Sequence, residues 1–406
     1  MRAGAAGAPV STASFRPRLF KGTDMLRNHS AMMRRASRLM RPAKRGRATR
    51  KFMKAVTGLM AAPVSAPRRA ETKSRVADVQ ALLPGHPARP RIPTGAQYVA
   101  RTHHCAAGSR RFKLYLPASR PRRPRGLILM LHGCSQTPDD FAIGTHMNAE
   151  AERHGLAVAY PAQIKGRMNS ASCWNWFRPR HQLRGTGEPA ILASLARKLT
   201  RELGLGRDDV FVAGLSAGGA MAVILADLYP DLFSAAGIHS GLARGSARNA
   251  ISAMSVMRSG SAFKVNMPTI AARTDPVRWI IFQGGADSTV HPSNATMLVA
   301  AVLGEDAAPT KISNRSAGGR DYARSEYAGA SGATLVEHWL VDGAGHAWSG
   351  GRAAGSFTDR KGPDASAHMA RFFTTKPARV RSPGTPARLG GSFHVPSPIE
   401  TAPHHQ

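Results

Sequence analysis

Residues 210–228 read VFVAGLSAGGAMAVILADL. The apolar segment Val210–Ala213 is typical of a strand, and Ala217–Leu228 is typical of a helix. Between them stands Gly214-Leu215-Ser216-Ala217-Gly218, whose two glycines permit a turn too sharp for larger residues. Such a turn leaves Ser216 projecting at the carboxyl edge of a sheet, near the positive end of a helix dipole. We predict that Ser216 is a nucleophile; a glycine-rich helix start without chemistry is the alternative.

Strand-like and helix-like segments alternate along the middle of the chain. Gly126–Leu131 (GLILML) is apolar throughout, as in a strand buried on both faces of a parallel sheet, whereas Arg111–Pro117 alternates like an edge strand. The pattern predicts one α/β domain, in which a mainly parallel sheet is flanked by helices. The predicted strands are 111–117, 126–131, 156–160, 210–213, 233–239, 277–282 and 334–341, and the predicted helices are 141–154, 188–203, 217–228, 293–303 and 363–373.

Basic residues are concentrated at the start of the chain. The 406 residues carry 57 Lys and Arg against 24 Asp and Glu, a formal net charge of +33, and residues 1–100 hold 21 of the basic residues against 3 acidic ones. An arm of this kind attracts polyanions, whether nucleic acid, polyphosphate or an acidic membrane surface. A solvated leader, or translation that starts at Met25, is the alternative interpretation.

Composition also predicts where the folded domain begins and ends. Residues 76–93 are rich in Pro, Ala and Arg and are typical of a linker, and the residues from 376 onward are rich in Pro, Ser, Gly and Arg. We therefore expect a basic, largely disordered leader and linker over 1–94, a folded domain over 95–375 and a disordered tail over 376–406.

Composition excludes two classes of protein. No apolar stretch approaches the roughly 20 residues that span a bilayer, so no transmembrane segment is expected. Three cysteines are too few for a disulfide scaffold and lack zinc-ligand spacing. Residues 52–66 (FMKAVTGLMAAPVSA) have the elements of a secretory signal, although they lie far from Met1 and their apolar run is interrupted by Thr57 and Gly58.

A nucleophilic serine needs a base, and the base needs a carboxylate that orients it. Asp287 stands in a glycine-rich turn after the strand predicted to end at Phe282, and His346 stands in Gly343-Ala344-Gly345-His346 after the last predicted strand. We predict Asp287 as the acid and His346 as the general base. Asp342, directly after that last strand, is the rival acid. A helix cap or an Asx turn is the alternative role for Asp287, and a structural histidine is the alternative for His346.

An oxyanion hole needs two backbone N–H donors. Ala217 directly follows the predicted nucleophile, and its N–H is the first candidate. The second should come from His132-Gly133-Cys134-Ser135-Gln136, which follows the strand at 126–131, and we predict the N–H of Cys134. His132 is expected to orient this loop rather than to take part in chemistry.

Aromatic residues gather in Cys173-Trp174-Asn175-Trp176-Phe177. Trp174 and Trp176 are predicted to contact the substrate through an apolar platform, and covering the core is the alternative. A disulfide between Cys134 and Cys173 would tie this segment to the oxyanion loop, with free thiols as the alternative; Cys105 is left over either way.

Taken together, the motifs resemble the poly(3-hydroxybutyrate) depolymerase family of esterases, in the α/β-hydrolase superfamily. The resemblance covers roughly residues 95–375, with all of its blocks in order. The blocks are LHGCSQTPDDF from Leu131, SCWNWF from Ser172, GLSAGGAMA from Gly214, GIHSGLA from Gly237, QGGADSTVHP from Gln283, DGAGHAWSGG from Asp342 and GSFTDRKGPDASAHMARFF from Gly355.

The resemblance implies an α/β-hydrolase esterase domain that acts through an acyl-enzyme, with Ser216 as nucleophile, Asp287 as acid and His346 as base. It implies a carboxylic ester hydrolase for short-chain polyhydroxyalkanoates such as poly(3-hydroxybutyrate) or its oligomers, with no metal or organic cofactor. Feruloyl and acetylxylan esters are the alternative substrates. The family resemblance also implies an extracellular location, with a cytoplasmic one as the alternative.

A competing hypothesis is a non-catalytic protein that uses a hydrolase fold as a platform for binding polymer or polyanion. In that case the basic arm would make the main contact, with a polyanion or with a polyester granule surface. A complete set of nucleophile, acid, base and oxyanion donors favours the enzyme, because a binding protein does not need them.

Overall fold

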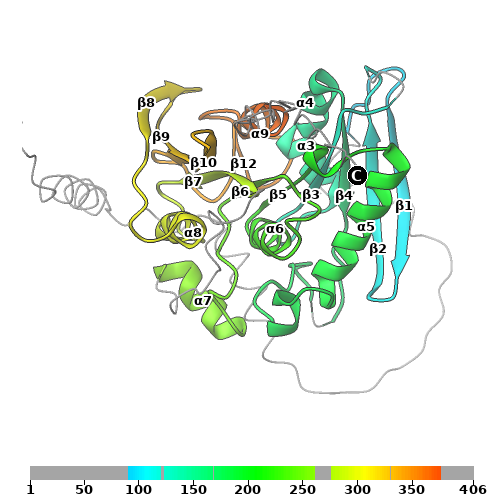
Figure 1. The fold of residues 1–406 in the computed structure, drawn as a ribbon, viewed down its shortest axis with the longest axis horizontal. Coiled ribbons are helices and arrows are strands. Elements are labelled where there is room, and N and C mark those ends of the chain that lie inside the picture. The colour runs from blue at the N-terminus through cyan, green and yellow to red at the C-terminus, as the bar shows by residue number, and fades with distance from the viewer. Residues whose placement is uncertain (1–89, 120–122, 168, 261–275, 330, 376–406) are drawn as a thin grey trace, which may run out of the picture. The chain divides into compact units, whose positions relative to one another are not determined.

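A ten-stranded sheet and a separate two-stranded ribbon form the framework of the described chain (Figure 1). The computed structural model describes residues 90–119, 123–167, 169–260, 276–329 and 331–375. The strands are β1 (Gln97–Cys105), β2 (Gly108–Leu116), β3 (Gly126–Leu131), β4 (Leu156–Pro161), β5 (Val210–Leu215), β6 (Ala235–His239), β7 (Arg278–Gly284), β8 (Lys311–Ala317), β9 (Arg320–Ala328), β10 (Thr334–Val341), β11 (Trp348–Ser349) and β12 (Thr358–Asp359).

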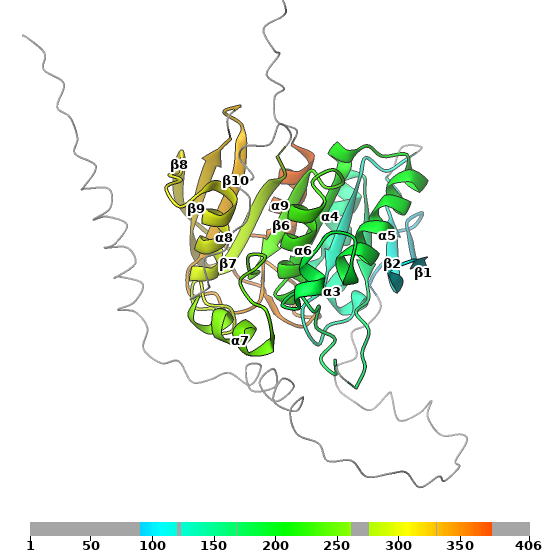
Figure 2. The same ribbon diagram turned by 60° about the horizontal axis from the view of Figure 1, so that its bottom comes forward.

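The middle of the large sheet is parallel. Strands β4, β3, β5, β6, β7 and β10 lie side by side in that order and run in one direction. The antiparallel pair β1–β2 extends the sheet beyond β4, and the antiparallel pair β9–β8 extends it beyond β10, at the opposite end in Figure 2. Because parallel strands end at one edge of a sheet, the loops after β3, β5, β6, β7 and β10 meet there.

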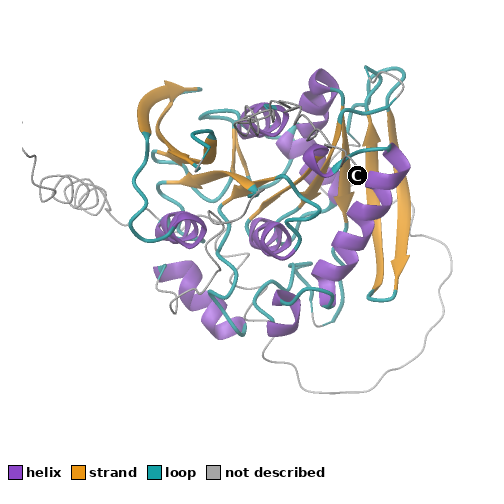
Figure 3. Ribbon diagram, viewed as in Figure 1, coloured by secondary structure: helices purple, strands orange, loops and turns teal. Residues whose placement is uncertain are grey.

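Helices cover both faces of this sheet, as the purple helices around the orange strands of Figure 3 show. On one face α9 packs against α4 and the strands β6 and β7; on the other, α6 packs on β5 and β6, and α8 on β7 and β10. The helices are α3 (Pro138–Thr145), α4 (Met147–His154), α5 (Gly187–Leu203), α6 (Ala217–Leu228), α7 (Ala250–Ser259), α8 (Ser293–Leu303) and α9 (Ala365–Thr374), with single 3₁₀ turns at Pro179–Gln182 and Arg207–Asp209. Within the described ranges, none of these helices has the length and apolar character that crossing a membrane requires.

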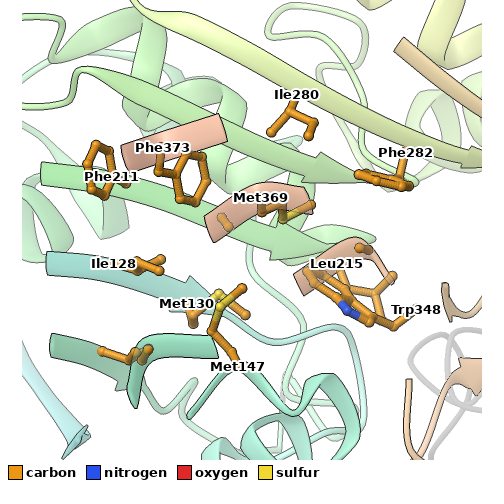
Figure 4. Packing of buried hydrophobic residues seen from close by; sticks show 14 of the residues in the cluster. Ile128, Met130, Met147, Phe211, Leu215, Ile280, Phe282, Trp348, Met369 and Phe373 are labelled. Atoms are coloured by element: carbon orange, nitrogen blue, oxygen red, sulfur yellow. The ribbon is translucent and has the colours of Figure 1, made fainter. Parts of the chain in front are cut away.

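The main core lies between the sheet and α9. Phe373 of α9 stacks on Phe211 of β5 with ring centroids 4.9 Å apart, and Figure 4 shows the two rings side by side. Met369, one turn earlier, reaches Gly237 of β6, where an added Cβ would lie 2.7 Å from the methionine sulfur. A glycine at this point therefore allows the helix to pack close to the strand.

The α/β architecture predicted from the sequence is confirmed, but the ends of the sheet differ from the prediction. The pattern misses β1, β8 and β9, whose residues are mostly polar and only partly buried. Because β1 pairs with β2, the segment predicted as an edge strand lies one position inside the sheet. The helix predicted over 141–154 is two helices, since His146 adopts a left-handed conformation (φ 57°) between α3 and α4.

The predicted leader and tail fall almost entirely on residues that the structure does not describe. Residues 1–89 and 376–406 lie outside the described residues, and so does the segment 52–66 with its signal-like composition. The domain boundaries at 94/95 and 375/376 therefore stay predictions.

The stacking of α9 on the sheet leads to a stability prediction. Replacing Phe373 with alanine removes a ring that is 1% exposed, and such changes cost about 3–5 kcal/mol because the cavity is only partly refilled. We expect the free energy of unfolding, measured by urea titration, to fall by about that amount. Ile251→Ala is the control: Ile251 is 72% exposed, so its replacement should change stability by no more than about 0.5 kcal/mol. Equal effects of the two substitutions would contradict this account of the core.

Candidate active site

The turn between β5 and α6 has the geometry that the glycine pattern predicts. Ser216 has φ 57° and ψ −120°, a combination rare for a residue with a side chain, and α6 begins at the next residue. Its N–H donates to the carbonyl of His239 at the end of β6 (2.9 Å), which fixes the turn against the neighbouring strand. The hydroxyl is therefore carried on a strained, well-held backbone at the carboxyl edge of the sheet.

The two glycines of the turn are required by close backbone contacts. A Cβ on Gly218 would lie 2.1 Å from the carbonyl oxygen of Leu131, and one on Gly214 would lie 2.4 Å from the carbonyl carbon of Gly218. No side chain fits at either position unless the backbone moves. The start of α6 is thus pressed directly against the end of β3, where the predicted oxyanion loop begins.

Asp287 and His346 form a direct pair at the same edge. The Nδ1 atom of His346, after β10, lies 2.8 Å from Oδ2 of Asp287, after β7. The other carboxylate oxygen accepts the N–H groups of Thr289 (2.9 Å) and Val290 (2.8 Å). Burial opposes ionisation of Asp287, but the His346 interaction and these hydrogen bonds outweigh it and hold the pKa of the carboxyl below its usual value.

The predicted acid, Asp287, and its rival, Asp342, differ in their contacts. Asp342 is exposed at the end of β10, and its N–H donates a hydrogen bond to the carbonyl of Asp321. Asp287 is 3% exposed and is the carboxylate that contacts the imidazole of His346. With Nδ1 donating to Asp287, Nε2 of His346 is left as the acceptor that a general base needs.

The loop after β3 leaves one N–H unused between Gly133 and Gln136. The Gly133 N–H donates to Oε1 of Gln136 (2.8 Å), that of Ser135 to the carbonyl of Ala171 (2.5 Å), and that of Gln136 to the carbonyl of Gly133 (3.3 Å). Among the described residues, the N–H of Cys134 has no hydrogen-bond partner. The N–H of Ala217 is also available, because Ala217 is the first residue of α6 and the first N–H groups of a helix have no partner within it. These are the two donors that the sequence analysis nominates for an oxyanion.

Side chains from the loop after β4 hold the predicted oxyanion loop, residues 132–136, in place. Cys134 forms a disulfide with Cys173 (S–S 2.08 Å), while Cys105 is a free thiol. The indole N–H of Trp174 donates to the carbonyl of His132 (3.0 Å), and Nε2 of His132 accepts the N–H of Gln163 (3.1 Å). His132 is 1% exposed and orients the loop through these bonds; burial lowers its pKa to about 4, so the ring is neutral near pH 7.

The prediction of an aromatic platform is wrong for Trp174. Its ring is fully buried, beneath the guanidinium of Arg110 and against the ring of His132, so it supports the oxyanion loop and presents no surface to a substrate. Trp176 is 5% exposed, as Ser216 is, and its contact with substrate stays a prediction.

Several buried polar residues around the site are missed by sequence reasoning. Gln283 donates to Oδ2 of Asp287 (3.2 Å) and to the carbonyl of Val290 (3.0 Å), which holds the Asp287 carboxylate in place. Glu188 accepts the N–H of Asn175 (2.8 Å) and thereby holds the tryptophan loop. Asp140 accepts the N–H and hydroxyl of Ser356 and so ties the oxyanion side of the site to the segment after β11. A polar residue inside or directly beside an apolar element is the only sequence signal for them.

In the described ranges, no group of three or more His, Cys, Asp or Glu residues is arranged to hold a metal ion. The geometry that is present matches a strand-to-helix serine turn with a carboxylate–imidazole pair and two free amide donors.

A comparison with protein families agrees with this geometry: the model described as esterase PHB depolymerase matches residues 110–323, just over half of the chain. The chain belongs to this family.

The curated relatives of this chain are named after different substrates. Poly(3-hydroxyalkanoate) depolymerase C of Paucimonas lemoignei is 29% identical over 250 residues, which cover 57% of this chain and 56% of the relative. Feruloyl esterase B of Neurospora crassa is 28% identical over 176 residues, 40% of this chain and 59% of the relative. The matched region thus spans little more than half the length of each relative.

Solved structures show the fold. The acetyl xylan esterase from Aspergillus awamori superposes with a TM-score of 0.51 over 62% of this chain and 93% of its own, at 22% sequence identity. The family member described here therefore has an α/β-hydrolase fold.

The disulfide next to the oxyanion loop leads to a prediction about stability. Its cysteines are 39 residues apart, and opening a loop of this length is expected to cost about 3–4 kcal/mol by the chain-entropy argument. The double substitution Cys134→Ser, Cys173→Ser should lower the free energy of unfolding by that amount in guanidinium titrations. The control is Cys105→Ser, which removes the free thiol and should be close to neutral. A double variant as stable as the control would show that the disulfide does not hold the loop.

The Asp287–His346 pair predicts how stability depends on pH. Since the folded-state pKa of Asp287 is lowered from 3.8, its carboxylate stabilises the folded protein fully above pH 3.8, and the contribution is lost as the pH falls through the folded-state value. Asp287→Asn should therefore be less stable than the wild type at pH 7, and the difference should shrink below pH 3.8. Urea titrations across this range measure it; a difference that grows toward acid would contradict the assignment.

Proposed function

We propose that the chain is a carboxylic ester hydrolase that cleaves short-chain polyhydroxyalkanoates, such as poly(3-hydroxybutyrate) or its oligomers, through an acyl-enzyme. The observation that carries the proposal is the 2.8 Å contact between His346 Nδ1 and Asp287 Oδ2, at the sheet edge where Ser216 forms the strained turn. Membership of an esterase family supports the same reaction.

In the first half of the reaction, Nε2 of His346 takes the hydroxyl proton of Ser216 while the serine oxygen attacks the ester carbonyl carbon. The negative charge that develops on the carbonyl oxygen is stabilised by the N–H groups of Cys134 and Ala217. The tetrahedral intermediate then collapses: the bond to the alcohol oxygen breaks, and His346 returns the proton to that oxygen. The alcohol fragment leaves, and the acyl group stays on Ser216.

In the second half, water replaces the alcohol. His346 takes a proton from the water, the hydroxyl adds to the acyl carbon, and the serine oxygen departs with the proton that His346 returns. Asp287 remains a carboxylate throughout and stabilises the imidazolium that forms in each half. Its lowered pKa suits this role, because the group must not take the proton itself.

The choice of substrate rests on the family and on the relatives. The matching family is described as esterase PHB depolymerase, and two curated relatives are named as depolymerases of poly(3-hydroxyalkanoate) and poly(3-hydroxybutyrate). Other relatives are named as acetylxylan and feruloyl esterases, so these esters are the second candidate substrates. All of these candidates share a carbonyl that the same serine chemistry would attack.

We further propose that the protein acts outside the cytoplasm. The disulfide between Cys134 and Cys173 supports this location, because such bonds persist in oxidising compartments. The basic arm over 1–94 would add a contact with a polyanion or with a granule surface. Its residues up to 89 lie outside the described residues, and a granule-sedimentation assay with and without the arm tests this contact.

The catalytic proposal predicts that Ser216→Ala lowers kcat for p-nitrophenyl butyrate by at least about 10⁴-fold, because the acyl-enzyme can no longer form. Thermal unfolding of the variant should match that of the wild type. The panel of substrates comprises 3-hydroxybutyrate oligomers, amorphous polymer granules, methyl ferulate and acetylated xylan, each assayed with wild type and variant.

The outcomes of this panel separate the candidate functions. Oligomer or granule hydrolysis that disappears in the variant supports the depolymerase. Hydrolysis of ferulate or acetylxylan alone would assign plant esters, and not polyhydroxyalkanoates, as the substrates. Ester turnover retained by Ser216→Ala would overturn the assigned nucleophile. A wild type that hydrolyses nothing yet sediments with granules would favour the binding-platform hypothesis.

A further inference from the structure

One buried histidine beside the site has no part in the proposed reaction steps. His239 is the last residue of β6, between the strands that carry Ser216 and Asp287, and it is 1% exposed. Its ring is stacked between those of Phe282 (5.9 Å between centroids) and Trp348 (5.2 Å). An imidazole in such an apolar sandwich needs its polar atoms satisfied, or burial is costly.

The hydrogen bonds of His239 reach both halves of the site. Its carbonyl oxygen accepts the N–H of Ser216 (2.9 Å), and Nε2 of its ring accepts the N–H of Ser349 (3.0 Å), three residues after His346. Since Ser349 supplies a backbone donor, Nε2 carries no proton and Nδ1 holds it, 3.2 Å from the hydroxyl oxygen of Ser240. One residue thus contacts the backbone of the predicted nucleophile and the loop of the predicted base.

The ring of His239 is neutral near pH 7, so its Nε2 atom remains an acceptor. Burial lowers the pKa of His239 to about 3, the neighbouring His346 lowers it as well, and Asp287 acts in the opposite direction. The neutral ring therefore keeps its lone pair on Nε2 directed at Ser349. The loop with His346 is glycine-rich, so it depends on such outside contacts for its position.

We propose that His239 is a positioning residue, which sets the spacing between Ser216 and His346 by accepting the Ser349 N–H at Nε2. The inference rests on the proposed function, since it concerns the same serine and base. Without the acceptor, the Ser349 N–H is left unpaired in a buried environment and the loop shifts to satisfy it. Misplacing a catalytic group by about 1 Å costs on the order of 10²-fold in rate.

The test compares His239→Gln with His239→Met. The two replacements have unbranched chains of similar length, but only glutamine places an amide oxygen near the original Nε2 position. We expect His239→Met to lower kcat for p-nitrophenyl butyrate by about 10²-fold, with KM within about threefold of the wild type, because the buried ring does not touch substrate. His239→Gln should keep kcat within about tenfold.

A third variant, His239→Asn, keeps a polar amide but places it at a different position. In His239→Asn the amide matches the Nδ1 end of the ring and falls short of Ser349, so this variant should behave like His239→Met. If His239→Met gives no folded protein, the comparison of glutamine with asparagine answers the same question. His338→Asn is the control, because it also places an amide at a strand position that holds a histidine. Nε2 of His338 has no hydrogen-bond partner among the described residues, so kcat should not change.

The results separate this inference from the proposed function. A wild type that turns over no ester overturns both. An active wild type with an equally active His239→Met, or equal losses in the methionine and glutamine variants, overturns the positioning role alone. A loss that appears in KM instead of kcat also overturns it, because that would place the ring in contact with substrate.

Discussion

The strained backbone of Ser216 is the constraint on which the rest of the site depends. A residue with φ 57° and ψ −120° costs of order 1–3 kcal/mol, so its surroundings must leave it no alternative. Gly214 and Gly218 remove the side chains that would push the strand and helix apart, and the His239 carbonyl holds the Ser216 N–H. The turn persists because three independent contacts require the same conformation.

The same constraint brings the two predicted oxyanion donors, the N–H groups of Cys134 and Ala217, together. Since Gly218 lies against the carbonyls of Leu131 and His132, the helix carrying the Ala217 N–H is in backbone contact with the strand that leads to Cys134. Their relative position is therefore set by the packing of main chain on main chain. The disulfide and the Trp174–His132 hydrogen bond then limit how far the loop around Cys134 can move.

The parts of this site that can be predicted from the sequence are those with a local signal. A glycine-flanked serine between an apolar strand and a helix, and polar residues after later strands, suffice to nominate Ser216, Asp287 and His346. The contact with His346 that separates Asp287 from its rival Asp342 is visible only in the structure, because both residues follow strands that end at the same edge. The burial of Trp174 also escapes prediction, since composition does not say which side of a loop faces the core. The strands β1, β8 and β9 are missed because their outer positions are polar, so neither a buried run nor strict alternation marks them.

A buried carboxylate beside a histidine does not by itself make an acid–base pair, as Glu188 shows. Glu188 lies 3.4 Å from Nδ1 of His181, and its pKa is lowered despite burial, much as for Asp287. Its two oxygens, however, accept from Asn175 and Gln163, and Nδ1 of His181 accepts the Glu188 N–H at 3.4 Å, so the imidazole is held as part of the scaffold. The Asp287 pair differs because its histidine stands on a glycine-rich loop at the edge that carries the strained serine. Electrostatics alone would nominate both pairs; the backbone around Ser216 decides between them.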